Sequence, residues 1–180
     1  MGRAGGSAAD DPGAAADDRP DPERLLAELG AVLCGQIVAV VPDWVEREVD
    51  RIVGAWVATG PAGGVDRIAV RQEAQEAGRR AAADVAVGLQ ALVSADLDAQ
   101  WTTPLEIIRS AVVYPTGVIL RAGVPPVVRS SFEEERFPDD AYGLTPASLG
   151  AVDPGLSDPG RAWGAAKAMA HKARHGRSGA

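Results

Sequence analysis

The chain has only one cysteine and two histidines, and each shortage argues against a class of protein. A single cysteine, Cys34, cannot form a disulfide within the chain, which is typical of a reducing compartment. The N-terminus lacks a cationic segment followed by an apolar run, and the longest apolar run, Leu29 to Val41, is too short to span a membrane. The sequence therefore predicts a cytoplasmic protein without membrane contact.

Few side chains suited to catalysis are present. Both histidines, His171 and His175, lie near the C-terminus, where Lys172 and Arg174 would repel a metal ion and no third ligand is near in sequence. Cys34 lies in an apolar run with no neighbouring cation to lower its pKa. We therefore predict no catalytic residue, no metal and no cofactor, and an enzyme is the less favoured class.

The charge is negative overall and unevenly distributed. The net charge of −7 repels nucleic acid at long range. Residues 131–158 hold seven acids and one base, whereas residues 159–180 hold five bases and no acid. Two interpretations stay open: the two segments screen one another, or the basic segment contacts nucleic acid or an acidic protein surface.

Helical periodicity extends over residues 22–123. Asp21-Pro22-Glu23 predicts a helix start, Pro42 predicts the end of that helix, and Asp43 to Glu46 predicts the start of a second. The second helix carries Trp56 on its apolar stripe, so Trp56 should be a core residue and Trp44, beside the cap, should matter less.

Two further helical stretches follow. Residues 66–95 form the longest pattern, in which Gly78 and Gly88 predict a kink or a close helix crossing. Thr103 to Glu106 has the pattern of a capping box, and we expect a helix that breaks near Tyr114-Pro115 and stops at Gly123.

The periodicity ends after residue 123. Residues 124–160 read as an extended arm rich in proline, glycine and acids, and Phe132 is predicted to fill a notch opened by the break at Pro115. Alternatively, Phe132 and Phe137 flank an acidic block that docks on a partner. A short basic helix then follows, with Trp163 on one side. The candidate contact residues are Phe132, Phe137, Arg161, Trp163, Lys167, Lys172 and Arg174.

Several short motifs in the C-terminal half are similar to those of a group of known proteins. Thr103 with Pro104-Leu105-Glu106, Tyr114-Pro115, Gly123 to Val127, Phe137 to Asp140, and Trp163 to Lys167 lie in the C-terminal half. This half resembles small conserved proteins of unknown function in high-GC actinobacteria. The resemblance implies no activity and no site residue.

Together these features predict an all-α protein with a bundle of three or four helices. We expect a disordered acidic tail over residues 1–21, a helical core over 22–123, the arm over 124–160, and a basic helix with a frayed end over 161–180. The favoured function is a non-enzymatic interaction or adaptor protein with a protein partner. The alternatives are an accessory factor that contacts nucleic acid or a ribonucleoprotein through the basic helix, and an enzyme with a pocket under the arm.

Overall fold

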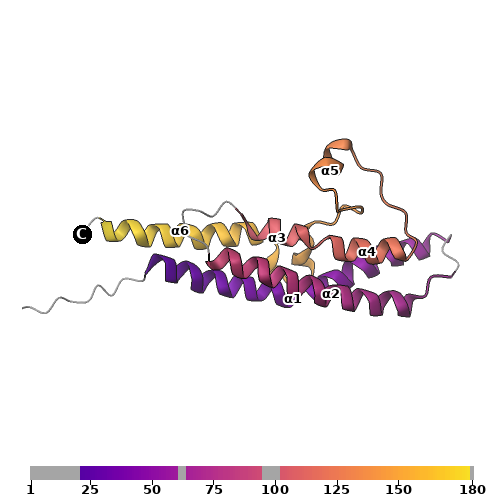
Figure 1. Ribbon diagram of the computed structural model, residues 1–180, viewed down its shortest axis with the longest axis horizontal. Helices are drawn as coiled ribbons and strands as arrows, with labels where there is room; N and C mark the ends of the chain where they lie inside the picture. The colour runs from indigo at the N-terminus through magenta and orange to yellow at the C-terminus, as the bar shows by residue number, and fades with distance from the viewer. Residues whose placement is uncertain (1–20, 61–63, 95–101, 179–180) are drawn as a thin grey trace, which may run out of the picture.

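The structure, a computed structural model, describes residues 21–60, 64–94 and 102–178, and within these ranges it contains helices and loops but no strand (Figure 1). The predicted all-α class is confirmed. The elements are α1 (Pro22–Ala58), α2 (Arg67–Ser94), α3 (Pro104–Ser110), α4 (Val113–Arg121), α5 (Ser131–Arg136), the 3-10 helices η1 (Pro146–Ala151) and η2 (Pro154–Leu156), and α6 (Pro159–Ser178). The expected tail over residues 1–20 and the helix break near Asp96 lie outside the described residues.

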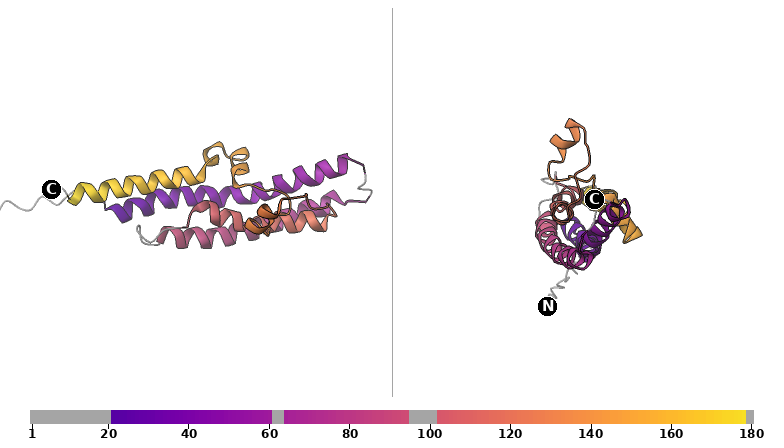
Figure 2. Two further views of the ribbon diagram at one scale, coloured as in Figure 1. Left: turned by 90° about the horizontal axis from the view of Figure 1, so that it is seen from above. Right: turned by 90° about the vertical axis from the view of Figure 1, so that its right-hand side faces the viewer.

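The two longest helices, α1 and α2, run side by side along the length of the molecule (Figures 1 and 2). α6 lies along the N-terminal half of α1, and α3 and α4 follow one another along the other half of the pair. One continuous core joins these helices, because apolar residues at helical spacing face inward from each. Its fully buried members include Ile37, Val41, Trp44, Val49, Val85, Leu89, Ile108 and Ile119.

The helix end predicted at Pro42 is wrong, because α1 continues without interruption from Pro22 to Ala58. A proline inside a helix costs about 3 kcal/mol through a lost hydrogen bond and a clash with the preceding turn. Here Ile37, Val41 and Val45 are buried on both sides of Pro42, so an interruption would expose a continuous apolar stripe. Packing against α2 therefore outweighs the local signal.

The crossing of α1 and α2 lies where Pro42 meets Gly78. A Cβ atom added at Gly78 would lie 2.9 Å from Pro42 Cα and 3.0 Å from its carbonyl oxygen. Only glycine allows this approach of two backbones. The close crossing predicted at Gly78 is confirmed, and Gly88 makes a second one against the side chain of Ile107.

The two tryptophans of α1 have the reverse of their predicted burial. Trp44 is fully buried, and its Nε1 donates a 2.6 Å hydrogen bond to Ser148 Oγ, whereas Trp56 is only half-buried. The prediction placed Trp44 next to a helix cap that does not exist. Because α1 is continuous, Trp44 instead lies in its middle, where η1 covers it.

The break between α3 and α4 falls at Ala111 and Val112, earlier than predicted. Pro115 occupies the first turn of α4, where its missing N–H removes no helical hydrogen bond. The stop predicted at Gly123 is confirmed, since Gly123 follows α4 with a φ of +84°. The Tyr114 hydroxyl donates to Asp84 and Arg121 pairs with Glu73, so both ends of α4 are tied to α2.

The core does not end at residue 123. Tyr142, Leu144, Leu149 and Leu156 from the predicted arm are all buried and belong to the same apolar cluster as the helices. The stretch from Pro125 to Asp139 behaves differently, since none of its residues is buried. We call residues 125–139 the projecting segment, and Figure 1 shows α5, which belongs to it, standing away from the helices.

α1 is long and apolar enough to cross a membrane by length and composition, with a mean hydropathy of 1.9 over 18 residues of which 33% are buried. Sequence reasoning missed this because it ended the helix at Pro42. The core helix of a soluble protein passes the same test, so the absence of membrane contact stays a prediction.

Replacing Trp44 by alanine should lower the free energy of unfolding by about 3–5 kcal/mol, because a fully buried indole is lost. Trp56→Ala, at a half-buried position, should cost less than about half as much. Guanidinium denaturation followed by circular dichroism measures both. Equal losses would show that η1 does not bury Trp44.

Two glycines of the long helices should respond in opposite ways to alanine. Gly78→Ala should destabilise the protein by about 1–3 kcal/mol, because the new methyl group overlaps the backbone of Pro42. Gly35→Ala, with no atom within 4 Å of the new Cβ, should stabilise it by about 0.5–1 kcal/mol through helix propensity. The same denaturation experiment compares them, and a neutral Gly78→Ala would contradict the close crossing.

Candidate functional site: the projecting segment and the groove beside it

The projecting segment has a fixed base. Tyr142 Oη donates a 2.7 Å hydrogen bond to the carbonyl of Val124, and the Val127 N–H donates to the carbonyl of Ala141 at 3.1 Å. Further out, Arg129 Nη1 donates to the carbonyl of Phe137 at 2.7 Å. The two limbs of the segment are therefore joined at three successive levels, and its shape does not depend on apolar burial.

Asp140 fastens the outgoing limb to the core. It is buried, and its Oδ1 accepts the N–H groups of Tyr142 at 3.1 Å and of Leu144 at 2.9 Å. A short acid that binds the backbone two residues later sets a turn locally. The chain thus changes from exposed to buried within a few residues.

Apolar side chains on the projecting segment face solvent. Phe132 is 65% exposed and Val128 is fully exposed, and Val127 is about half exposed. The prediction that Phe132 fills a notch at Pro115 is therefore wrong. The physical reason is α5 itself, which starts at Ser131 and points away from the helices, while Tyr142 supplies the buried aromatic ring near Val124.

Phe137 is the half-buried partner of two arginines. The guanidinium carbon of Arg109, from α3, lies 5.1 Å from the ring centroid, and that of Arg136, from α5, lies 5.2 Å from it. Arg136 also approaches the Phe132 ring, at 5.9 Å. Such contacts are cation–π attractions. They connect the projecting segment to α3.

A groove of about 740 Å³ lies between the projecting segment and the helices. Arg109, Arg129 and Arg136 contribute its cations, and Glu106, Glu133, Asp139 and Asp140 contribute its carboxylates. Apolar atoms come from Val112, Phe137, Pro138 and Leu144. The volume is that of an ordinary ligand pocket.

Most of the carboxylates in the groove bind backbone N–H groups. Glu106 Oε2 accepts the N–H of Thr103 at 3.2 Å, as the predicted capping box requires. Glu133 Oε2 accepts the N–H of Ser130 at 2.9 Å and its hydroxyl at 2.8 Å. These two hydrogen bonds hold the pKa of Glu133 below its ordinary value, with a smaller contribution from the charge of Arg129.

The candidate residues of α6 lie in different environments, and Trp163 is buried. Trp163 is 2% exposed and packs on α1 over Gly30, where a Cβ would lie 2.8 Å from its ring, so it cannot serve as a surface contact. Ala166 and Ala170 are buried beside it. The sequence placed Trp163 on one side of the helix correctly, but that side faces the core.

The cations of α6 do not form one open surface. Arg161 and Lys172 are exposed, whereas Lys167 and Arg174 are half-buried and Arg174 lies 3.6 Å from Glu23 at the start of α1. Screening of the basic helix therefore comes in part from α1. α5, which carries the acidic block, stands apart from α6 (Figures 1 and 2).

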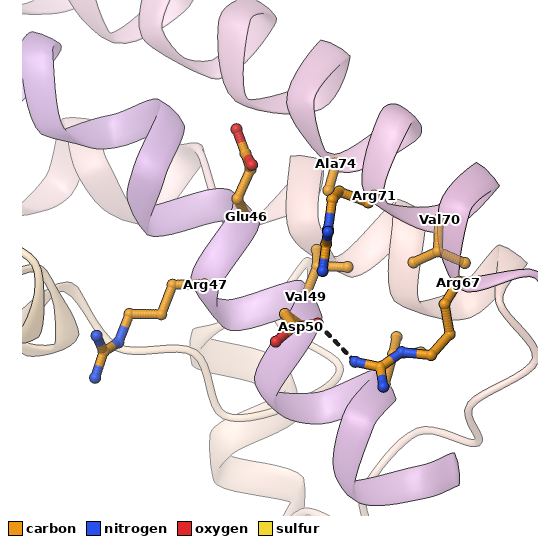
Figure 3. Close-up of a pocket in the computed structure, with 9 residues that line it drawn as sticks. Glu46, Arg47, Val49, Asp50, Arg67, Val70, Arg71 and Ala74 are labelled. Carbon is orange, nitrogen blue, oxygen red and sulfur yellow. Dashed lines mark hydrogen bonds and ion pairs between the residues drawn. The ribbon is translucent and has the colours of Figure 1, made fainter.

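A second, smaller hollow of about 240 Å³ lies between α1 and α2 (Figure 3). Arg67 Nη2 crosses it to Asp50 Oδ1 at 2.9 Å, and Gln75 lies 3.4 Å from Glu46. Figure 3 shows Arg47 pointing away from the other labelled side chains. The polar groups here join the two helices to one another, which makes this hollow a structural feature.

Sequence reasoning named Phe132 and Phe137 but missed Arg109, Arg129 and Arg136. One signal was available, because Ser130 and Glu133 have the spacing of a capping box and predict α5. That helix places Arg136 beside Phe137. Nothing in the sequence indicates that Arg109, 28 residues from Phe137, meets the same ring.

Cys34 and the histidines lie outside this site. Burial raises the pKa of the Cys34 thiol to about 11, which opposes a nucleophilic role. His171 and His175 lie on α6, and within the described ranges no group of three or more potential ligands could hold a metal ion.

Cys34 should resist alkylation in the folded protein. Because its pKa is raised above that of an exposed thiol, almost no thiolate forms at pH 8, and reaction with iodoacetamide should be at least about tenfold slower than after unfolding in guanidinium. Mass spectrometry of quenched samples gives both rates. Equal rates would place the thiol in contact with solvent.

Comparison of the chain with protein-family models, with curated proteins and with solved structures finds no match. The resemblance to actinobacterial proteins stays a prediction, and the function has to be inferred from the geometry above.

Proposed function

We propose that the protein is a non-enzymatic interaction or adaptor protein of the cytoplasm, in which a helical bundle presents the projecting segment to a protein partner. The observation that carries this proposal is the exposure of Val127, Val128 and Phe132 on a segment that stands away from the core. Apolar side chains gathered on one protruding element are typical of interaction sites.

The fixed base of the segment supports the same proposal. A loop whose limbs are joined by hydrogen bonds from Tyr142, Val127 and Arg129 loses little conformational freedom on binding. Its exposed phenylalanine is also a side chain that contributes strongly to interfaces. The segment can therefore act as a preformed contact surface.

The basic helix supports the nucleic-acid alternative less well. Trp163 is buried rather than free to stack on a base, and Arg174 lies beside Glu23. The enzyme alternative places its pocket under the arm, where the groove lies. Glu106, Glu133 and Asp140 there bind backbone groups, which favours a structural or recognition role for these acids over proton transfer.

A photo-crosslinking amino acid at position 132 should capture a specific protein in cells, because this position faces outward. The same amino acid at Val87 of α2, which is 71% exposed, provides the control. The captured protein, once purified, should bind the Phe132→Ser variant at least about tenfold more weakly, because a residue at the energetic centre of an interface contributes about 2 kcal/mol or more.

Val87→Ser should leave that affinity unchanged, and both variants should keep the parent's thermal midpoint. Capture at Val87 but not at position 132, or normal binding by Phe132→Ser, would contradict the proposed role of the segment.

A further inference from the structure

We propose that the groove beside the projecting segment recognises a single carboxylate of a peptide segment, with the guanidinium groups of Arg109 and Arg136 as its partners. The inference rests on the proposed function, because it gives the chemical character of the protein partner. The exposed apolar residues then contact the partner at the outer end of the segment, and the groove holds a charged part of it nearer the helices.

The two arginines are available for such a ligand. Neither Arg109 nor Arg136 has a carboxylate within ion-pair distance among the described residues, and both instead lie against the Phe137 ring. Other arginines of the chain do have carboxylate partners, namely Arg24, Arg51, Arg67, Arg79, Arg80 and Arg121, whereas Arg47, Arg71 and Arg161 resemble Arg109 and Arg136 in having no ion pair among the described residues but lie outside the groove. Stacking on a ring fixes a guanidinium plane while leaving its N–H edge open.

The neighbouring carboxylates do not satisfy these arginines. Glu106 is bound to the Thr103 N–H, Glu133 to Ser130, and Asp140 to the N–H groups of Tyr142 and Leu144. Arg129 differs, because it donates to the carbonyl of Phe137 and its charge acts on Glu133. The hydrogen bonds of the fold therefore hold three of the four acids in place, all but Asp139, and leave two guanidinium groups for a ligand.

The charge of the groove favours a carboxylate over a phosphate. Three arginines share the lining with four carboxylates, so a doubly charged phosphate meets net repulsion there. The net charge of −7 adds repulsion of a nucleic-acid backbone at long range. A singly charged carboxylate can still form the two parallel hydrogen bonds that a guanidinium offers.

The rest of the lining suits a peptide. Val112, Phe137, Pro138 and Leu144 supply apolar contacts beside the cations, within a groove of about 740 Å³. The exposed ring of Phe132 lies on the same α5 as Arg136 and is 5.9 Å from its guanidinium carbon. A chain that crosses the groove can thus contact charged and apolar groups in turn.

Titration of the full-length protein with a blocked tetrapeptide that holds one glutamate among three alanines, and therefore one negative charge, tests the inference without the cellular partner. The arginine Nε–Hε resonances of Arg109 and Arg136 should shift in NMR spectra, and the same peptide with glutamine in place of glutamate should produce no such shift. R109Q and R136Q should each weaken binding of the glutamate peptide by about tenfold, the loss of one charge-assisted contact.

The matched control is R71Q, which removes the same charge from an exposed arginine of α2 outside the groove. It should leave the affinity for the glutamate peptide within about twofold, as expected for a screened distant charge. An equal effect of R71Q and R136Q, or equal binding of the glutamine peptide, would overturn the inference. Arg136 is exposed, so R136Q should fold normally even if R109Q does not.

A titration with inorganic phosphate tests whether the groove prefers a phosphate or a carboxylate. If phosphate shifts the same resonances at lower concentrations than the glutamate peptide, the groove is a phosphate site and the inference is wrong. The titration and the crosslinking experiment test different proposals. If a cellular partner is captured at position 132 but the peptide does not bind, the role proposed for the groove is wrong and the proposed function stands.

Discussion

The contact of Pro42 with Gly78 is the constraint on which the rest of the structure depends. It brings the backbones of α1 and α2 together at the middle of both helices, and α3, α4, α6 and η1 pack on the surface of that pair. α6 takes the N-terminal half of α1, where Gly30 accommodates the Trp163 ring, and α3 meets α2 at Gly88. Small residues at three contacts thus set how the helices approach one another.

The residues after Gly123 complete the core instead of leaving it. Trp44 would be partly uncovered without η1, whose Ser148 accepts its N–H, and Leu149 and Leu156 enter the same cluster. The chain then returns through α6 to the start of α1. Within the described residues, the stretch 125–139 contributes no side chain to this cluster, and the contrast with its neighbours is what makes it a candidate for recognition.

Sequence signals predicted those features that depend on interactions between residues close together in the chain. The start of α1 at Pro22, the extent of α2, the stop at Gly123 and the buried side of α6 all follow from caps, glycine and helical periodicity. The prediction failed at Pro42. The local cost of a proline inside a helix is outweighed there by the burial of apolar side chains against α2, and a short stretch of sequence around Pro42 gives no information about that contact. The burial of Trp44 and Trp56 was predicted in the wrong order for the same reason.

The site was harder to predict than the fold. Phe132 and Phe137 could be named because two aromatics beside an acidic block are unusual in this chain, but their separate environments depend on the direction of α5. Arg109 reaches Phe137 only because the chain turns back at Asp140 and lies over α3. Trp163 was predicted to be a surface contact because of its residue type, but the missing Cβ atom at Gly30 leaves room for its ring in the core.

The hydrogen bond from Tyr142 to Val124 also has a consequence for how this sequence can change. It brings the two ends of the projecting segment together independently of what lies between them. Doubling the length of a loop between fixed ends costs only about 0.6 kcal/mol in closure entropy. The segment can therefore be lengthened, shortened or exchanged with little effect on the packing of the helices.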